Sequence, residues 1–231
     1  DFEERVWREV QEWVEAAATV RALRNSRIGY LGHYYPGMLD MYSDFTAVSA
    51  QTGAHIEVLE MCDLDACVNP VTQPEIDNIL DITRALFTLE DTPDEDLQWA
   101  ARIAAGLDRL TAKFSLDGLT YYYRGLDGNP YERLGAGLIL GNSLLTARGI
   151  PASGEGDLKT CLAMMIMDRF GAGGSYTEFY AMDFKDNFVL MGHDGPAHLA
   201  ISARQPVLRG LGLYHGKRGR GVSVEFNVKT G

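Results

Sequence analysis

The sequence predicts an α/β fold in two parts. Over residues 1–116, short apolar runs alternate with longer segments whose apolar residues recur every three or four positions, as in strands joined by crossover helices. After residue 200, short β-prone runs are separated by turns that contain Gly or Pro. We therefore expect a Rossmann-like parallel-sheet domain over 1–116 and a mixed α/β to β-rich domain over 117–231 that is incomplete at Gly231.

The elements expected in the first part follow from this spacing. In order they are a helix over 3–23, a strand over 27–31, a helix over 44–52, a strand over 54–61, and helices over 72–89 and 93–114. The first helix is amphipathic. Asp44 is the candidate N-cap of the second helix and Gly53 its stop signal. In the strand over 54–61, we expect Ile56, Val58 and Leu59 to lie in the core.

The second part is expected to mix helices with a hairpin. Its elements are a strand over 118–123, helices over 130–148 and 157–170, hairpin strands over 176–184 and 188–191, and a strand over 222–228. Asp186-Asn187 forms the hairpin turn. Because side chains alternate along a strand, Tyr121 and Tyr123 share one face of the strand over 118–123.

Composition and charge exclude several classes of partner. The net charge of −11 argues against nucleic acid, because binding to phosphate needs a basic surface. No apolar run approaches the length of about 18 residues of a membrane-spanning helix, so we expect no membrane partner. The spacing of Cys62, Cys67 and Cys161 fits neither a disulfide framework nor a zinc site. Reduced thiols are typical of a cytoplasmic protein, which is the location we expect.

Three side chains are candidate metal ligands. Glu155 stands between two glycines, Glu178 lies near the start of the expected hairpin, and His193 directly follows its second strand. The hairpin brings Glu178 and His193 close together, and a folded-back chain is needed for Glu155 to join them. Two carboxylates and one imidazole suit an octahedral divalent ion such as Mn²⁺ better than a structural zinc ion. The alternative is that these are ordinary solvated side chains.

The residues around these candidates resemble a known family. Gly-Glu-Gly-Asp-Leu-Lys-Thr at 154–160, an expected helix, Thr-Glu-Phe-Tyr at 177–180 and a strand ending in Gly-His resemble the L-arabinose isomerase and L-fucose isomerase family in residue type, order and approximate spacing. The resemblance covers most of this chain but only part of such a protein. The family's N-terminal α/β domain and its fourth metal ligand, a histidine near the C-terminus, have no counterpart here.

The resemblance implies a divalent-metal-dependent aldose–ketose isomerase that acts on a pentose or a 6-deoxyhexose by an enediol mechanism. Glu155, Glu178 and His193 are then the ligands of Mn²⁺, or of another divalent ion such as Mg²⁺ or Co²⁺. Glu155 and Glu178 are also the catalytic acid/base pair, and either is a candidate for the first proton transfer. The family's shared sites imply a homo-oligomer, a trimer or a hexamer.

The resemblance also suggests two substrate contacts: Met38 and Tyr123. Met38 lies in the loop after the first strand, and Tyr123 ends the strand over 118–123. Asp194 is a candidate for orienting a water molecule or a sugar hydroxyl, and equally for capping a turn. The His-Asp-Gly-Pro sequence at 193–196 departs from the arabinose isomerase pattern after the histidine, which indicates a divergent branch.

Two other function classes compete with the isomerase. A non-catalytic sugar-binding or regulatory module would keep the α/β frame, although plain sugar binding needs no metal ligands. A related sugar epimerase would use the same metal chemistry and would differ in its product.

Overall fold

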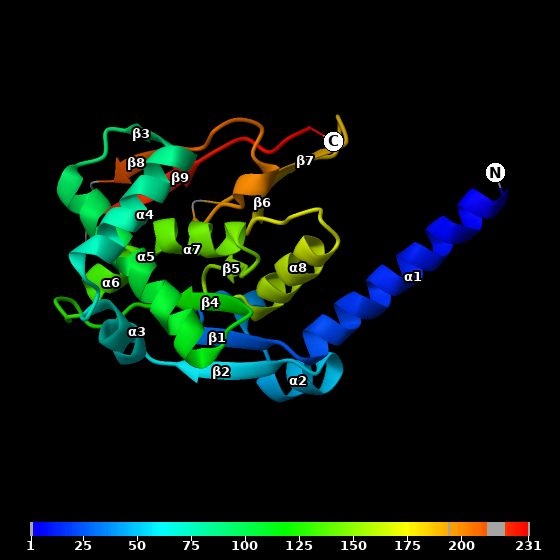
Figure 1. Ribbon diagram of the computed structural model, residues 1–231, viewed down its shortest axis with the longest axis horizontal. Coiled ribbons are helices and arrows are strands. Elements are labelled where there is room, and N and C mark those ends of the chain that lie inside the picture. Colours follow the sequence, from blue (N-terminus) through cyan, green and yellow to red (C-terminus); the bar gives the residue numbers. More distant parts are fainter. Residues whose placement is uncertain (1, 194, 212–219, 231) are drawn as a thin grey trace.

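A four-stranded, all-parallel sheet forms the centre of the molecule, as predicted. In the computed structural model, which describes residues 2–193, 195–211 and 220–230, the strand order is β2-β1-β4-β5 (Figure 1). The strands are β1 (Arg27–Gly32), β2 (His55–Leu59), β4 (Gly118–Tyr122) and β5 (Ala152–Ser153). The sheet takes strands from both sides of Leu116, so the division of the chain near that residue stays a prediction.

Helices cover both faces of this sheet. The α-helices after the first strand are α2 (Phe45–Thr52), α3 (Met61–Val68), α4 (Gln73–Leu86), α5 (Asp94–Phe114), α6 (Glu132–Ala136), α7 (Leu138–Ala147) and α8 (Leu158–Arg169). The larger core cluster combines one face of the sheet with α3, α4, α5 and α7, and Leu31 and Leu119 are fully buried in it. The smaller cluster joins the other face to α8, with Ile28 and Tyr30 from β1. Alternation along β1 therefore divides its side chains between two cores.

The predicted second helix is confirmed in detail. Asp44 caps α2, and its carboxylate accepts hydrogen bonds from the backbone N–H groups of Thr46 and Ala47. Gly53 ends α2 with a φ of 80°, a left-handed conformation in which glycine is favoured.

Several predicted elements need correction. The helix expected over 130–148 is two helices, α6 and α7, divided at Gly137. The helix expected to reach residue 89 ends at Leu86, and Thr88–Glu90 forms strand β3. Helix α3 was not predicted. Val58, expected in the core, is 56% exposed because β2 is the edge strand of the sheet.

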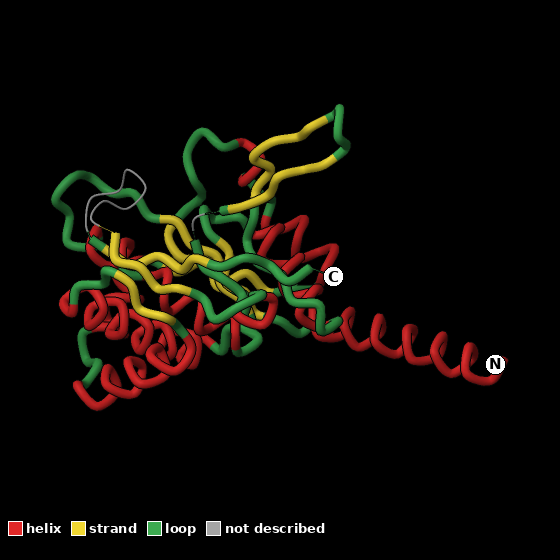
Figure 2. Tube along the Cα trace, turned by 90° about the horizontal axis from the view of Figure 1, so that it is seen from above, coloured by secondary structure: helices red, strands yellow, loops and turns green. Residues whose placement is uncertain are grey.

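The C-terminal part is β-rich, as predicted, and contains a small mixed sheet. Strand β3 pairs in parallel with β8 (Val207–Leu211), which pairs antiparallel with β9 (Gly221–Glu225). The predicted hairpin is also present as β6 (Glu178–Asp183) and β7 (Phe188–Gly192). These two strands, residues 178–192, form a separate two-stranded sheet that projects from the body of the molecule, and we call them the ribbon (Figure 2).

Helix α1 (Phe2–Arg24) confirms the first predicted helix but does not pack along its length. It extends away from the body, and Trp7 and Trp13 are 66% and 72% exposed (Figure 1). Among the described residues, no helix combines the length and the apolar character that crossing a bilayer requires. All three cysteines are free thiols.

Candidate metal centre

Glu155 lies on the loop between β5 and α8, at the carboxyl edge of the parallel sheet, where open α/β sheets bind ligands. The sheet holds this loop from two sides. The N–H of Gly156 donates to the carbonyl of Tyr121 at 3.0 Å, and the N–H of Tyr35 donates to the carbonyl of Glu155 at 2.8 Å. The backbone of Glu155 is therefore fixed to β4 and to the loop that follows β1.

The conformation of this loop depends on its glycines. Glu155 itself has a φ of 60°, in the left-handed region that costs a residue with a side chain about 1 kcal/mol. Gly156 has a φ of 75°, and a Cβ there would lie 2.6 Å from the Cα of Tyr34. A Cβ on Gly154 would lie 3.1 Å from the ring of Tyr176. The two glycines allow the close approach that presents Glu155.

The start of α8 fixes the loop on its other side. Asp157 caps the helix by accepting hydrogen bonds from the backbone N–H and the hydroxyl of Thr160. Lys159 donates to the carbonyls of Asp40 and Tyr42, which connects α8 to the loop after β1. The carboxylate of Glu155 thus stands on a well-supported part of the fold.

The ribbon supplies the other two candidate ligands. Glu178 is paired with Gly192 in the register of β6 and β7, so His193 directly follows the residue opposite Glu178. This confirms the expectation that the hairpin brings the two side chains together. Beyond His193 the chain returns to the helices: the N–H of Ala197 donates to the hydroxyl of Ser143 at 2.9 Å.

Ligand atoms of Glu155, Glu178 and His193 all lie within 4.8 Å of one another, and each residue is half-buried. Two carboxylate oxygens and an imidazole nitrogen form a donor set that suits Mn²⁺ or another divalent ion of octahedral preference. The three residues therefore fit the ion that the sequence predicted. Burial, followed by the charge of Glu155, raises the pKa of Glu178, as expected where two carboxylates share a small volume.

Tyr176 is a residue of this site that the sequence analysis missed. Its hydroxyl donates to Oε2 of Glu155 at 3.0 Å, and its ring meets that of His193 edge-on with a centroid separation of 4.4 Å. Burial, followed by the charge of Glu155, raises the pKa of Tyr176, so this hydroxyl stays protonated and acts as a donor. The available signal was its position two residues before Glu178 in an extended segment, which places both side chains on one face.

The predicted substrate contacts fall in different surroundings. Met38 is half-buried just before the short 3-10 helix η1 (Leu39–Met41), and Met41 contacts the hydroxyl of Tyr176 through its sulfur at 3.9 Å. Met38 therefore lies in the same loop as Met41, which contacts Tyr176 of the candidate metal centre, and substrate contact by Met38 stays a prediction. Asp194 lies outside the described residues.

Tyr123 has a different setting from its neighbour Tyr122. The hydroxyl of Tyr123 donates to Oδ1 of Asn129 at 2.7 Å, within the loop after β4. The ring of Tyr122 packs against those of His33 and Tyr35, at centroid separations of 5.2 and 4.6 Å. Since the N–H of Tyr35 donates to the carbonyl of Glu155, Tyr122 lies one contact away from the ligand loop. Substrate contact by Tyr123 stays a prediction.

Two carboxylates and an imidazole at the carboxyl edge of an α/β sheet form a candidate divalent-metal site. Comparison with known proteins identifies the chain further as a distant homologue of the L-arabinose isomerases, as its motifs predicted. It is 24% identical to the L-arabinose isomerase of Tolumonas auensis over 234 residues, or 96% of this chain and 46% of that protein. The corresponding enzyme of Shewanella baltica is 27% identical over 213 residues, or 87% of this chain and 41% of that protein.

The match is distant and partial. A third relative, the L-arabinose isomerase of Serratia proteamaculans, is 24% identical over 188 residues. The chain spans between 36% and 46% of the length of these three proteins. No protein-family model matches the chain.

Proposed function

We propose that this chain carries the metal centre of a divalent-metal-dependent aldose–ketose isomerase, which acts on a pentose or a 6-deoxyhexose by an enediol mechanism. The observation that supports this most directly is the convergence of Glu155, Glu178 and His193 from two separate parts of the chain. The distant homology to L-arabinose isomerases supports an isomerase reaction at this site.

The reaction moves a proton between two neighbouring carbons of the sugar. In our proposal Glu155 and Glu178 bind the ion and also form the acid/base pair. His193 acts as a neutral ligand. The ion, when bound, spreads the negative charge that develops on the sugar oxygens.

Mn²⁺ is the ion we propose first, with Mg²⁺ and Co²⁺ as alternatives that the same donor set accepts. We also propose that the protein is cytoplasmic and acts as a homo-oligomer, a trimer or a hexamer, whose subunits share their sites. The three free thiols agree with a cytoplasmic location.

The test is to incubate the protein with L-arabinose, L-fucose, D-arabinose, L-rhamnose and D-galactose, with Mn²⁺ or with EDTA, and to measure ketose. We expect ketose from at least one sugar with Mn²⁺ and none with EDTA. An epimeric aldose as the product would favour the epimerase. No product, together with no effect of Mn²⁺ on the melting temperature, would contradict the proposal and favour the sugar-binding module.

A further inference from the structure

The three candidate ligands stand on two different supports. Glu155 belongs to the loop between β5 and α8, which the parallel sheet holds through its backbone. Glu178 and His193 stand at the base of the ribbon, whose strands pair only with each other within the described part of the chain. Before an ion binds, a protein contact must fix the position of the ribbon relative to the Glu155 loop, so that the three ligands lie close together.

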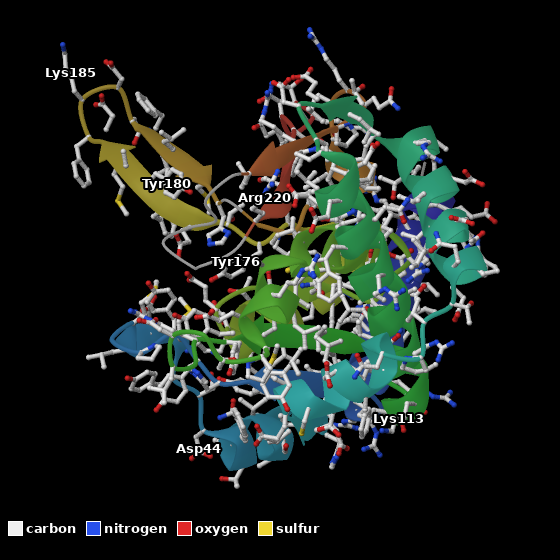
Figure 3. The ribbon with its side chains drawn as sticks, turned by 90° about the vertical axis from the view of Figure 1, so that its left-hand side faces the viewer. Asp44, Lys113, Tyr176, Tyr180, Lys185 and Arg220 are labelled. Atoms are coloured by element: carbon white, nitrogen blue, oxygen red, sulfur yellow. The ribbon has the colours of Figure 1, made fainter. Side chains whose placement is uncertain are left out.

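Tyr176 contacts both supports at once. It lies at the base of the ribbon, next to the body of the molecule (Figure 3). Its hydroxyl bonds to Glu155 at 3.0 Å, and its ring meets the imidazole of His193 at an interplanar angle of 71°. Its backbone leads directly into Glu178. The side chain is only 2% exposed, and the ring of Tyr176 lies against Gly154, so it has little freedom to move.

We propose that Tyr176 is a positioning residue of the metal centre, which orients the carboxylate of Glu155 through its hydroxyl and the imidazole of His193 through its ring. This role rests on the proposed function. A carboxylate has about four lone-pair sites, so one hydrogen bond from Tyr176 fixes its orientation and leaves sites for an ion. Residues that orient metal ligands in this way typically change metal affinity by about 10- to 100-fold when they are replaced.

The test is Tyr176→Phe, which removes the hydroxyl and keeps the ring. We expect the dissociation constant of Mn²⁺, measured by titration calorimetry, to rise by about 10-fold. We also expect a change in the electron paramagnetic resonance line shape of bound Mn²⁺, because that line shape reports on the symmetry of the ligand set. A variant that only loosened the fold would not alter this spectrum at saturating Mn²⁺.

Tyr131→Phe is the matched control. The ring of Tyr131 packs edge-on against that of Tyr123, in the loop after β4, so loss of its hydroxyl is expected to leave both readouts unchanged. If Tyr176→Phe fails to fold, Gly154→Ala replaces it, because a new Cβ 3.1 Å from the ring of Tyr176 displaces the ring and keeps the hydroxyl. We expect that variant to weaken Mn²⁺ binding as well.

The proposal is overturned if Tyr176→Phe binds Mn²⁺ with unchanged affinity and an unchanged spectrum, while the proposed function stands. If the unaltered chain binds no Mn²⁺, the metal centre itself is refuted, and the role of Tyr176 falls with it. The two failures are distinguished by the titration of the unaltered chain.

Discussion

The parallel sheet and the ribbon both consist largely of apolar residues, yet they differ in burial. Leu31 and Leu119 in the sheet are 0% exposed, whereas Phe179 and Phe184 in the ribbon are 63% and 91% exposed. Helices cover both faces of the sheet, but the ribbon has no layer of its own among the described residues. An isolated two-stranded sheet is only marginally stable in water.

This difference bears directly on the candidate metal centre. The sheet fixes Glu155 by the fold alone, while Glu178 and His193 depend on the weaker support. We infer that the ion and Tyr176 together hold the ribbon in a fixed position against the sheet.

The largest effect is expected from Glu178→Gln. In the proposed mechanism, loss of this carboxylate removes one ligand and one member of the acid/base pair, so we expect ketose formation to fall by about 10³-fold or more. The fold should remain intact, because Glu178 is half-buried at the base of the ribbon and not in the core. Product assays and circular dichroism measure the two effects, with Glu12→Gln on the exposed helix α1 as the control. Normal turnover by Glu178→Gln would contradict the assignment.

Leucine truncation compares the two supports directly. Leu119→Ala removes a fully buried side chain from β4, and the free energy of unfolding should fall by about 2–5 kcal/mol. Leu190→Ala shortens a ribbon side chain that is 54% exposed, and it should change the free energy of unfolding by less than about 0.5 kcal/mol. Urea unfolding of both variants gives the comparison. Equal losses would mean that the ribbon is as well packed as the sheet.

The glycines of the Glu155 loop test how tightly the sheet side is built. Gly156→Ala combines a left-handed φ with a Cβ 2.6 Å from the Cα of Tyr34, so we expect a loss of about 3 kcal/mol in the free energy of unfolding. Gly128→Ala is the matched control, because its φ of 78° is similar but a Cβ there meets nothing within 4 Å. That variant should lose only about 1 kcal/mol. Similar losses would show that the loop does not pack closely.

The smallest effect concerns the helix pair α4 and α5 that covers the sheet. Hydrogen bonds from the hydroxyl and backbone N–H of Thr72, followed by the bond from Arg109, lower the pKa of Glu75 to about 2. A lowered pKa in the folded state contributes stability above the ordinary value of 4.5, and this contribution is lost as the pH falls from 4.5 towards 2. Glu75→Gln should therefore lose less stability than the unaltered chain between pH 7 and pH 3 in urea unfolding. If both proteins lost the same stability between pH 7 and pH 3, Glu75 would not contribute to the acid sensitivity of the fold.

Local signals in the sequence predicted much of this fold. The Asp44 cap and Gly53 fix α2, and the Asp186-Asn187 turn fixes the hairpin that pairs Glu178 with Gly192, the residue directly before His193. These features depend on residues close together in the chain, where spacing and turn chemistry are informative. The predicted hairpin, a local feature of the chain, also correctly placed Glu178 close to His193.

The remaining features depend on tertiary contacts or on less obvious caps. Helix α3 has only eight residues, and its capping box has Glu60 at the N-cap in place of the usual Ser or Thr and Asp63 three residues later in place of the usual Glu or Gln. Exposure of Val58 follows from the edge position of β2, which strand spacing does not reveal. The hydrogen bond between Tyr176 and Glu155 joins residues 21 positions apart in different segments, so no local sequence pattern predicts it.

Hydrogen–deuterium exchange with and without Mn²⁺ tests whether the ion joins the ribbon to the parallel sheet. If the ion joins the ribbon to the sheet through Glu155, Glu178 and His193, saturating Mn²⁺ should slow the exchange of backbone amides over residues 178–192. The amides of β1 and β4 should be slow in both conditions, and His193→Ala should abolish the protection of the ribbon. Equal exchange of the ribbon with and without Mn²⁺ would contradict a metal centre built from these two supports.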